Sequence, residues 1–182
     1  MNDIHVIRSA RKSLALTVLK DGEIQVRAPY YISDREIREF TEKHSDWIRK
    51  QRQTLSRAEN QVRLTEEELI KLAEAAKLDL PQRVAFFSSR MGIAYGRITI
   101  RNQKSKWGSC SSEGNLNFNC LLMLAPENVR DYVVVHELCH RRQMNHSPAF
   151  WAEVESVLPD YRERRRWLRE HGTELMARNP VS

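Results

Sequence analysis

The sequence has little of what marks several classes of protein. Only three of its 182 residues are cysteines, an odd number that fits a reducing compartment better than a disulfide framework. No apolar run approaches the ~20 residues of a membrane-spanning helix, and Met1-Asn2-Asp3 does not begin a secretory signal. We therefore expect a cytoplasmic protein with no membrane segment.

The composition suits a folded chain with a charged surface. Hydrophobic residues make up 41% and charged residues 30%, which allows one compact domain, or a domain with a small appendage. The net charge of +6 raises the possibility of a nucleic-acid partner, but over 33–63 the basic residues alternate with acids, as on a solvated helix face. A denser arginine cluster spans 162–169. Solvated surface is the favoured interpretation there, and a phosphate- or nucleic-acid-binding patch is the alternative.

Residues 1–60 are predicted to form a small β-hairpin and helix unit. Apolar residues alternate over 14–18 and 24–28, with Asp21-Gly22 at the turn between them, which is typical of an antiparallel hairpin. Residues 4–8 are a candidate third strand. Ser33 and Glu36 then form a capping box that opens a helix. The polar stretch 56–63 is the expected linker to a second domain, 61–182.

The second domain is predicted to be α+β. Thr65 and Glu68 form another capping box, opening a helix that backs the rest of the domain. Short strands are expected at 84–87, 97–101 and 115–123, in a small and mostly antiparallel sheet. The last helix is expected to follow Asp160 and to stop at Gly172.

The most informative stretch is Val135–His146, which contains His-Glu-x-x-His and a third histidine. His136 and His140 are one helical turn apart, so their imidazoles project from one face and can hold one metal ion. Glu137 lies beside that site, where a carboxylate can deprotonate water. His146 can join only if the helix ends first, which we predict between Met144 and His146.

The residues around His146 favour such a corner between two helices. Asn145 tolerates the left-handed conformation of a helix end, and Ser147-Pro148 is typical of the start of a new helix. Packing of Phe150 and Trp151 would fix the corner. The acceptors that orient the imidazoles cannot be identified from sequence, and the candidates are Glu153, Glu155 and Asp160.

The chain resembles the YgjP-like family of metal-dependent hydrolases, which are relatives of the SprT-like and other zincin metallopeptidases. The segments that carry the resemblance are 24–29, 44–48, 104–110, 132–140 and 145–151. The resemblance implies a zincin-like core with His136, His140 and His146 as zinc ligands and Glu137 as general base. It also implies that Trp107 and Ser109 border the active site as substrate contacts. The metzincin group, which shares the histidine spacing, is rejected because Gln143 stands where those proteins have glycine and no methionine turn follows.

Three functions are compatible with these residues. A zinc peptidase acting on an extended polypeptide is favoured, because three imidazoles leave zinc one open position for water. Some family members are described as UTP pyrophosphatases, and Lys104, Lys106, Arg141 and Arg142 could contact phosphates. However, the sequence has no Gly-rich phosphate loop and no carboxylate cluster for Mg²⁺. The third reading is a DNA- or protein-binding module with a non-catalytic metal site, in which Glu137 has no role.

Overall fold

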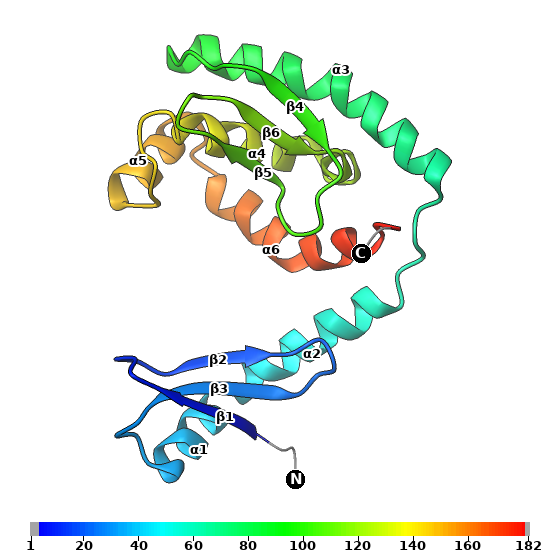
Figure 1. The fold of residues 1–182 in the computed structure, drawn as a ribbon. Coiled ribbons are helices and arrows are strands. Elements are labelled where there is room, and N and C mark those ends of the chain that lie inside the picture. Colours follow the sequence, from blue (N-terminus) through cyan, green and yellow to red (C-terminus); the bar gives the residue numbers. More distant parts are fainter. Residues whose placement is uncertain (1–3, 181–182) are drawn as a thin grey trace. The chain divides into compact units, whose positions relative to one another are not determined.

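This computed structural model describes residues 4–180 (Figure 1). The chain folds into two units, each with its own hydrophobic core. The boundary between the two units falls at Asn60 and Gln61. Among the described residues, no helix combines the length and the apolar character that crossing a bilayer requires.

The N-terminal unit contains a three-stranded sheet in the order β1-β3-β2. Its strands are β1 (Ile4–Ser9), β2 (Ala15–Val18) and β3 (Ile24–Pro29). β2 and β3 form the predicted antiparallel hairpin, and Gly22 supplies a positive φ of 81° in its turn. β1 pairs with β3 in parallel, so the unit is mixed and not wholly antiparallel as expected.

Two helices, α1 (Asp34–Lys43) and α2 (Ser45–Glu59), follow this sheet. The predicted capping box opens α1, because Ser33 accepts from the Glu36 amide and the Glu36 carboxylate accepts from the Ser33 amide. The break between the helices is at His44, whose Nδ1 lies 2.7 Å from the carbonyl oxygen of Phe40.

The second unit begins with the long helix α3 (Glu66–Met91), opened by the predicted capping box of Thr65 and closed by Gly92 in the left-handed conformation. The strand expected at 84–87 is wrong, because these residues belong to α3. Val84 and Phe87 continue a buried stripe that starts at Ala76 and Leu80, with helical spacing. A four-residue apolar run fits either structure, and here the longer helical pattern decides.

After α3 the chain forms a sheet in the order β4-β6-β5, and its strand β4 contacts α3. Its strands are β4 (Ile98–Arg101), β5 (Gly108–Cys110) and β6 (Leu116–Asn119). β4 pairs with β6 in parallel and β5 pairs with β6 antiparallel, so the sheet is mixed where a mostly antiparallel one was expected. The predicted third strand ends at Asn119, and its apolar continuation is the 3₁₀ helix η1 (Cys120–Leu124).

α4 (Glu127–Cys139) is the central helix of this unit, and it contacts α3, β5, α5 (Pro148–Val157) and α6 (Tyr161–Ala177). Residues 132–135 are buried on all sides, as the β-branched run predicts. α6 runs through Gly172 to Ala177, so the expected stop at this glycine is wrong. Gly172 is buried instead, and a Cβ placed there would lie 3.3 Å from Nε1 of Trp107.

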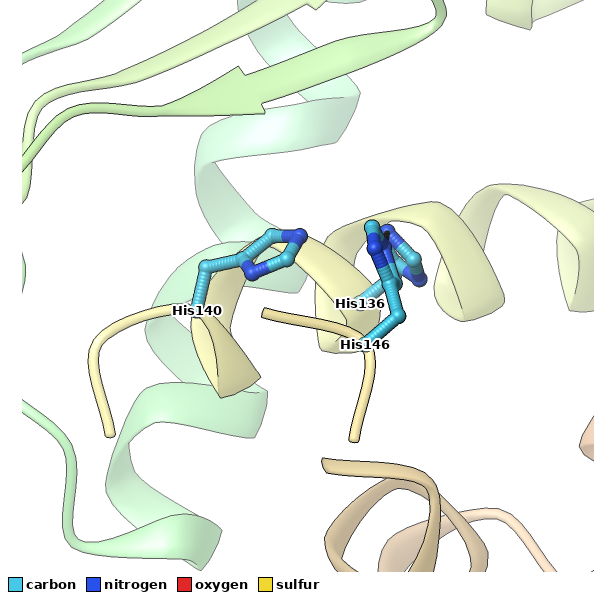
Figure 2. Close-up of side chains that lie close together, drawn as sticks. All are labelled: His136, His140 and His146. Atoms are coloured by element: carbon cyan, nitrogen blue, oxygen red, sulfur yellow. Dashed lines mark hydrogen bonds between the residues drawn. The ribbon is translucent and has the colours of Figure 1, made fainter. Parts of the chain in front are cut away.

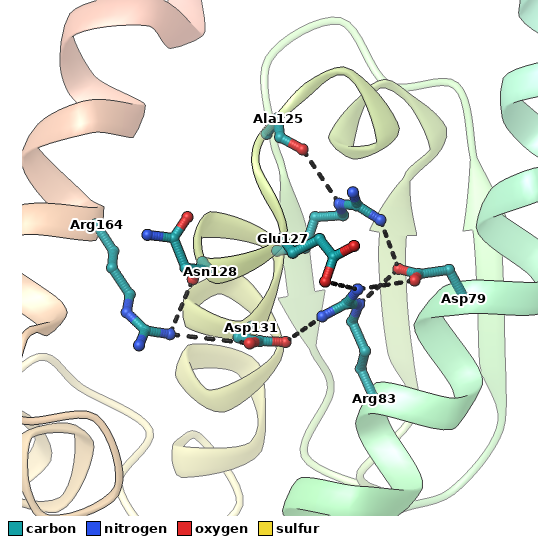
Figure 3. Close-up of polar contacts among 8 residues, drawn as sticks. Asp79, Arg83, Ala125, Glu127, Asn128, Asp131 and Arg164 are labelled. Carbon is teal, nitrogen blue, oxygen red and sulfur yellow. Dashed lines mark hydrogen bonds and ion pairs between the residues drawn. The ribbon is translucent and has the colours of Figure 1, made fainter.

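An ionic network fixes the N-terminal half of α4 between α3 and α6 (Figure 3). Arg83 of α3 binds Asp79 at 2.7 Å and Asp131 of α4 at 2.6 Å. Arg130 of α4 reaches Asp79 at 3.1 Å, and Arg164 of α6 approaches Asp131 at 3.9 Å. Because these groups are largely shielded from water, the network holds α4 in register with its neighbours.

Candidate metal centre

Three imidazoles converge where α4 ends (Figure 2). His136 lies in the last turn of α4, His140 caps the helix and His146 lies in the connection to α5. One ring nitrogen of each lies within 4.8 Å of the others, and the Nε2 atoms of His136 and His146 are 3.0 Å apart. The structure thus brings together the three histidines that the motif singled out.

The chain turns out of α4 earlier than the sequence suggested. The helix ends at Cys139, so the predicted end between Met144 and His146 is wrong. The next turn is tight, because the amide of Arg141 donates to the Leu138 carbonyl and the amide of Gln143 to the Cys139 carbonyl. Because α4 ends at Cys139 and His140 caps it, the following five residues can bring His146 back to the cluster.

Asn145 contributes to this corner through its side chain. No residue other than glycine has a positive φ in residues 4–180, so the left-handed conformation expected at Asn145 is wrong. Its Oδ1 accepts a hydrogen bond from the Ser147 amide at 3.3 Å. Ser147 in turn accepts from the Phe150 amide and caps α5, with Pro148 in the first turn as predicted.

Phe150 forms an aromatic base for the cluster. Its ring centroid lies 4.9, 4.7 and 4.8 Å from those of His136, His140 and His146, and its side chain is fully buried. Trp151 stacks on His146 with centroids 5.6 Å apart. One helical turn of α5 therefore orients the imidazoles that come from two other segments.

A backbone carbonyl orients His140. Its Nδ1 lies 3.0 Å from the carbonyl oxygen of Gln143, which directs Nε2 of the same ring to the cluster when Nδ1 carries the proton. Nδ1 of His136 is buried and has no hydrogen-bond partner among the described residues.

The acidic residues expected to orient the imidazoles have other partners. Each forms an ion pair with an arginine: Glu153 with Arg142, Glu155 with Arg162 and Asp160 with Arg164. That expectation is therefore wrong. A carbonyl acceptor leaves no mark in the sequence, because every residue carries one.

Burial lowers the pKa of two of the three imidazoles, those of His136 and His146. It lowers the pKa of His136 to about 3, with further contributions from the charges of His140, His146 and Arg165. The pKa of His146 is lowered by burial and then by His140 and Arg165. Neutral imidazoles are the form that binds metal ions, so the lowered pKa values of His136 and His146 favour metal binding.

Glu137 is enclosed between α4 and β5. Its side chain is 6% exposed, and a Cβ placed on Gly108 would lie 2.7 Å from both its Cγ and its Oε1. The glycine thus permits the close approach of strand and carboxyl group. Burial raises the pKa of Glu137 to about 8, and the positive charge of Lys106 acts in the opposite direction.

Trp107 and Ser109 lie on either side of Gly108 in the chain. Trp107 is partly buried against the core and meets Gly172 of α6. The Oγ of Ser109 accepts from Nδ2 of Asn117 at 3.3 Å. Because successive side chains of a strand alternate, Ser109 is directed to the face of β5 opposite the one that meets Glu137.

The family model for the YgjP-like metallopeptidase domain matches residues 12–73 and 67–171. No curated protein matches. Among solved structures, the metallopeptidase zymogen of Pyrococcus abyssi abylysin is 23% identical, with a TM-score of 0.45 over 50% of this chain and 93% of that one. The metallopeptidase zymogen of Methanocaldococcus jannaschii jannalysin is 22% identical, with a TM-score of 0.46 over 50% of this chain and 95% of that one.

Proposed function

The chain belongs to the YgjP-like family by its metallopeptidase domain, and on this premise we propose that it is a zinc-dependent peptidase. His136, His140 and His146 hold the zinc ion, and Glu137 is the general base. The observation that carries the proposal is the convergence of the three imidazoles, one of which, His136, is followed in the chain by the buried Glu137.

The cluster has dimensions that fit zinc. In tetrahedral coordination with Zn–N bonds of ~2.0–2.1 Å, ligand nitrogens lie roughly 3.3 Å apart. Nε2 of His136 and of His146 are 3.0 Å apart, and all three ligand atoms lie within 4.8 Å. No cysteine or carboxylate joins this cluster among residues 4–180. Three protein ligands with one open position are typical of a catalytic site, whereas structural sites recruit a fourth ligand.

The protein's own groups then perform the proton transfers. Zinc bound there would polarise the scissile carbonyl and make water more acidic. Glu137 accepts the proton of the attacking water and delivers it to the leaving nitrogen. Its enclosure by Gly108 fixes the position of the carboxyl group for both transfers.

The strand β5 offers a place for the substrate backbone. It is at the edge of its sheet, and Gly108 places it directly against Glu137. An extended polypeptide can add to such an edge through main-chain hydrogen bonds. In this arrangement Trp107 and Ser109 border the bound chain, with Ser109 contacting it only on the face away from Glu137.

A nucleoside-triphosphate substrate has less support. Of the four cations that the sequence offered for phosphates, Arg141 donates to the carbonyls of Ala94 and Ser112, and Arg142 pairs with Glu153. Both arginines therefore hold the loops around the cluster in place. The positive charge of Lys106 acts to lower the pKa of Glu137. Nucleoside triphosphates are nevertheless included as substrates in the test below.

The test compares wild-type protein with Glu137→Gln, after the zinc in each has been quantified. Both are offered unfolded protein substrates and, separately, nucleoside triphosphates. We expect one zinc per chain in both and cleavage of unfolded protein by the wild type alone. Cleavage of triphosphates only would replace the peptidase by a pyrophosphatase, and zinc without any cleavage would favour a binding module.

A further inference from the structure

One face of α6 carries four arginines next to the histidine cluster. Arg162, Arg165, Arg166 and Arg169 follow the i, i+3, i+4, i+7 spacing that places side chains on the same face of a helix. Together with Glu163 they line a surface hollow of about 500 Å³. The face is separate from the ionic network, which uses Arg164 of the same helix.

Three of these arginines have no carboxylate partner. In the part of the chain that the structure describes, Arg162 pairs with Glu155, whereas Arg165, Arg166 and Arg169 form no ion pair. They are exposed, so their guanidinium groups keep hydrogen-bond donors for a ligand. An external anion can therefore bind there without displacing an internal one.

Aromatic stacking joins this face to the metal centre. The guanidinium carbon of Arg165 lies 4.3 Å from the ring centroid of Trp151, and Trp151 stacks on His146. The charge of Arg165 also reaches His136 and His146, since it contributes to lowering the pKa of both. Only the indole of Trp151 thus separates Arg165, which lines the hollow, from His146.

We propose that this arginine face is a substrate subsite that selects polypeptides with acidic side chains near the scissile bond. The proposal rests on the peptidase function proposed above. Seven residues of helix span ~10 Å, and alternate side chains of an extended peptide are ~6.6 Å apart. Two carboxylates at alternate positions of a substrate can therefore both lie along the arginine face.

Other anions fit this face less well. The ring of Trp151 beside this face is already in contact with Arg165, Tyr161 and His146, so it offers no free platform on which bases could stack. Glu163 and Glu155 interrupt the positive charge that a run of phosphates would track. Residues 4–180 also contain no acidic cluster for Mg²⁺, the usual companion of a bound triphosphate.

The experiment measures binding of two labelled peptides to the Glu137→Gln protein, which prevents cleavage. The peptides differ only in carrying Glu or Gln at two alternate positions, and fluorescence anisotropy gives each Kd. Because an exposed charge pair contributes modestly, we expect the Glu peptide to bind about tenfold more tightly at low salt. Added salt should reduce this preference.

The decisive variant is Arg166→Gln/Arg169→Gln in the same background, which should lose most of the preference for Glu. Its matched control is Lys77→Gln/Arg90→Gln, which removes two exposed charges from α3 and should keep the preference. In protein that retains Glu137, the ratio of kcat/KM for the two peptides should fall in the arginine variant in the same way. Circular dichroism confirms that each variant is folded.

The remaining outcomes separate this proposal from the peptidase proposal. Equal Kd values for the two peptides, or equal losses in the arginine variant and its control, would overturn the subsite. Tripolyphosphate or single-stranded DNA that binds more tightly than the Glu peptide, and only with Arg166 and Arg169 present, would overturn the choice of polypeptide. A preference for Glu in protein that cleaves nothing would leave an acidic-peptide site and refute the peptidase.

Discussion

Replacing Gly108 by alanine tests whether the enclosure of Glu137 matters for catalysis. The added Cβ would lie 2.7 Å from Cγ and Oε1 of Glu137 and 2.9 Å from its Cδ, where real Cβ atoms are essentially never found. To reach an ordinary contact of 3.4 Å, the carboxyl group or the strand must retreat by about 0.7 Å. The three atoms nearest to the added Cβ all belong to Glu137 and none to a histidine.

The magnitude follows from that displacement. A misplacement of about 1 Å in a catalytic group can cost ~100-fold in rate, so we expect kcat for peptide cleavage to fall roughly 10- to 100-fold. Overpacking should lower the free energy of unfolding by about 1–3 kcal/mol. Zinc content should stay at the wild-type value, which separates a misplaced base from a lost metal.

Gly96→Ala is the matched control. Its Cβ would meet Oδ1 of Asn115 at 2.6 Å, a comparable clash that involves neither Glu137 nor the histidines. We expect a loss of stability with little change in kcat. The assays are steady-state cleavage of an unfolded protein, zinc quantification and urea unfolding. Wild-type kcat in Gly108→Ala, at full zinc content, would show that the position of the carboxyl group is not confined by β5.

Two further substitutions test the supports of the site. Phe150→Ala removes the fully buried ring beneath the three imidazoles, so the free energy of unfolding should fall by about 3–5 kcal/mol, and equilibrium dialysis should show weaker zinc binding. Asp79→Asn should cost about 1–3 kcal/mol at pH 7 in urea unfolding. Burial alone would raise the pKa of Asp79, but its hydrogen bonds and ion pairs with Arg83 and Arg130 outweigh burial and lower it below 3.8. That stabilisation is present above pH 3.8 and is lost as the pH falls through the lowered pKa. The free energies of unfolding of wild type and Asp79→Asn should therefore converge in acid. A difference that stays constant with pH would assign the loss to packing.

Local sequence signals predicted much of the fold. The α+β class, the hairpin at Gly22 and both capping boxes are confirmed, because each depends on residues a few positions apart. The strand expected at 84–87 failed because a short apolar run is ambiguous, and its membership of α3 is decided by packing over the whole helix. The parallel pairings of β1 with β3 and of β4 with β6 depend on how distant segments meet, which alternation within one strand does not encode.

The site divides in the same way. The spacing of His136, His140 and His146 correctly predicted that the three imidazoles converge, and their roles as ligands remain a proposal. The point where α4 ends was misjudged, because the backbone hydrogen bonds that close the turn after His140 can form at almost any sequence. The carbonyl of Gln143 was missed for a related reason, since a main-chain acceptor has no residue type. Arg165 was visible only as one of a run of arginines until Trp151 placed it beside the cluster.

Gly172 shows how a misread residue can be explained by the site. A glycine inside a helix costs about 1 kcal/mol relative to alanine, which is why the sequence suggested a helix end there. In the structure its missing side chain leaves room for the indole of Trp107, 3.3 Å from where a Cβ would lie. Trp107 precedes Gly108, the residue that admits Glu137 to β5. The two glycines therefore permit two neighbouring contacts. Gly172 lets α6 approach the indole of Trp107, and Gly108 lets β5 approach Glu137 of α4. The glycine that is unfavourable within α6 is thus explained by the packing of Trp107, the residue that precedes the strand against Glu137.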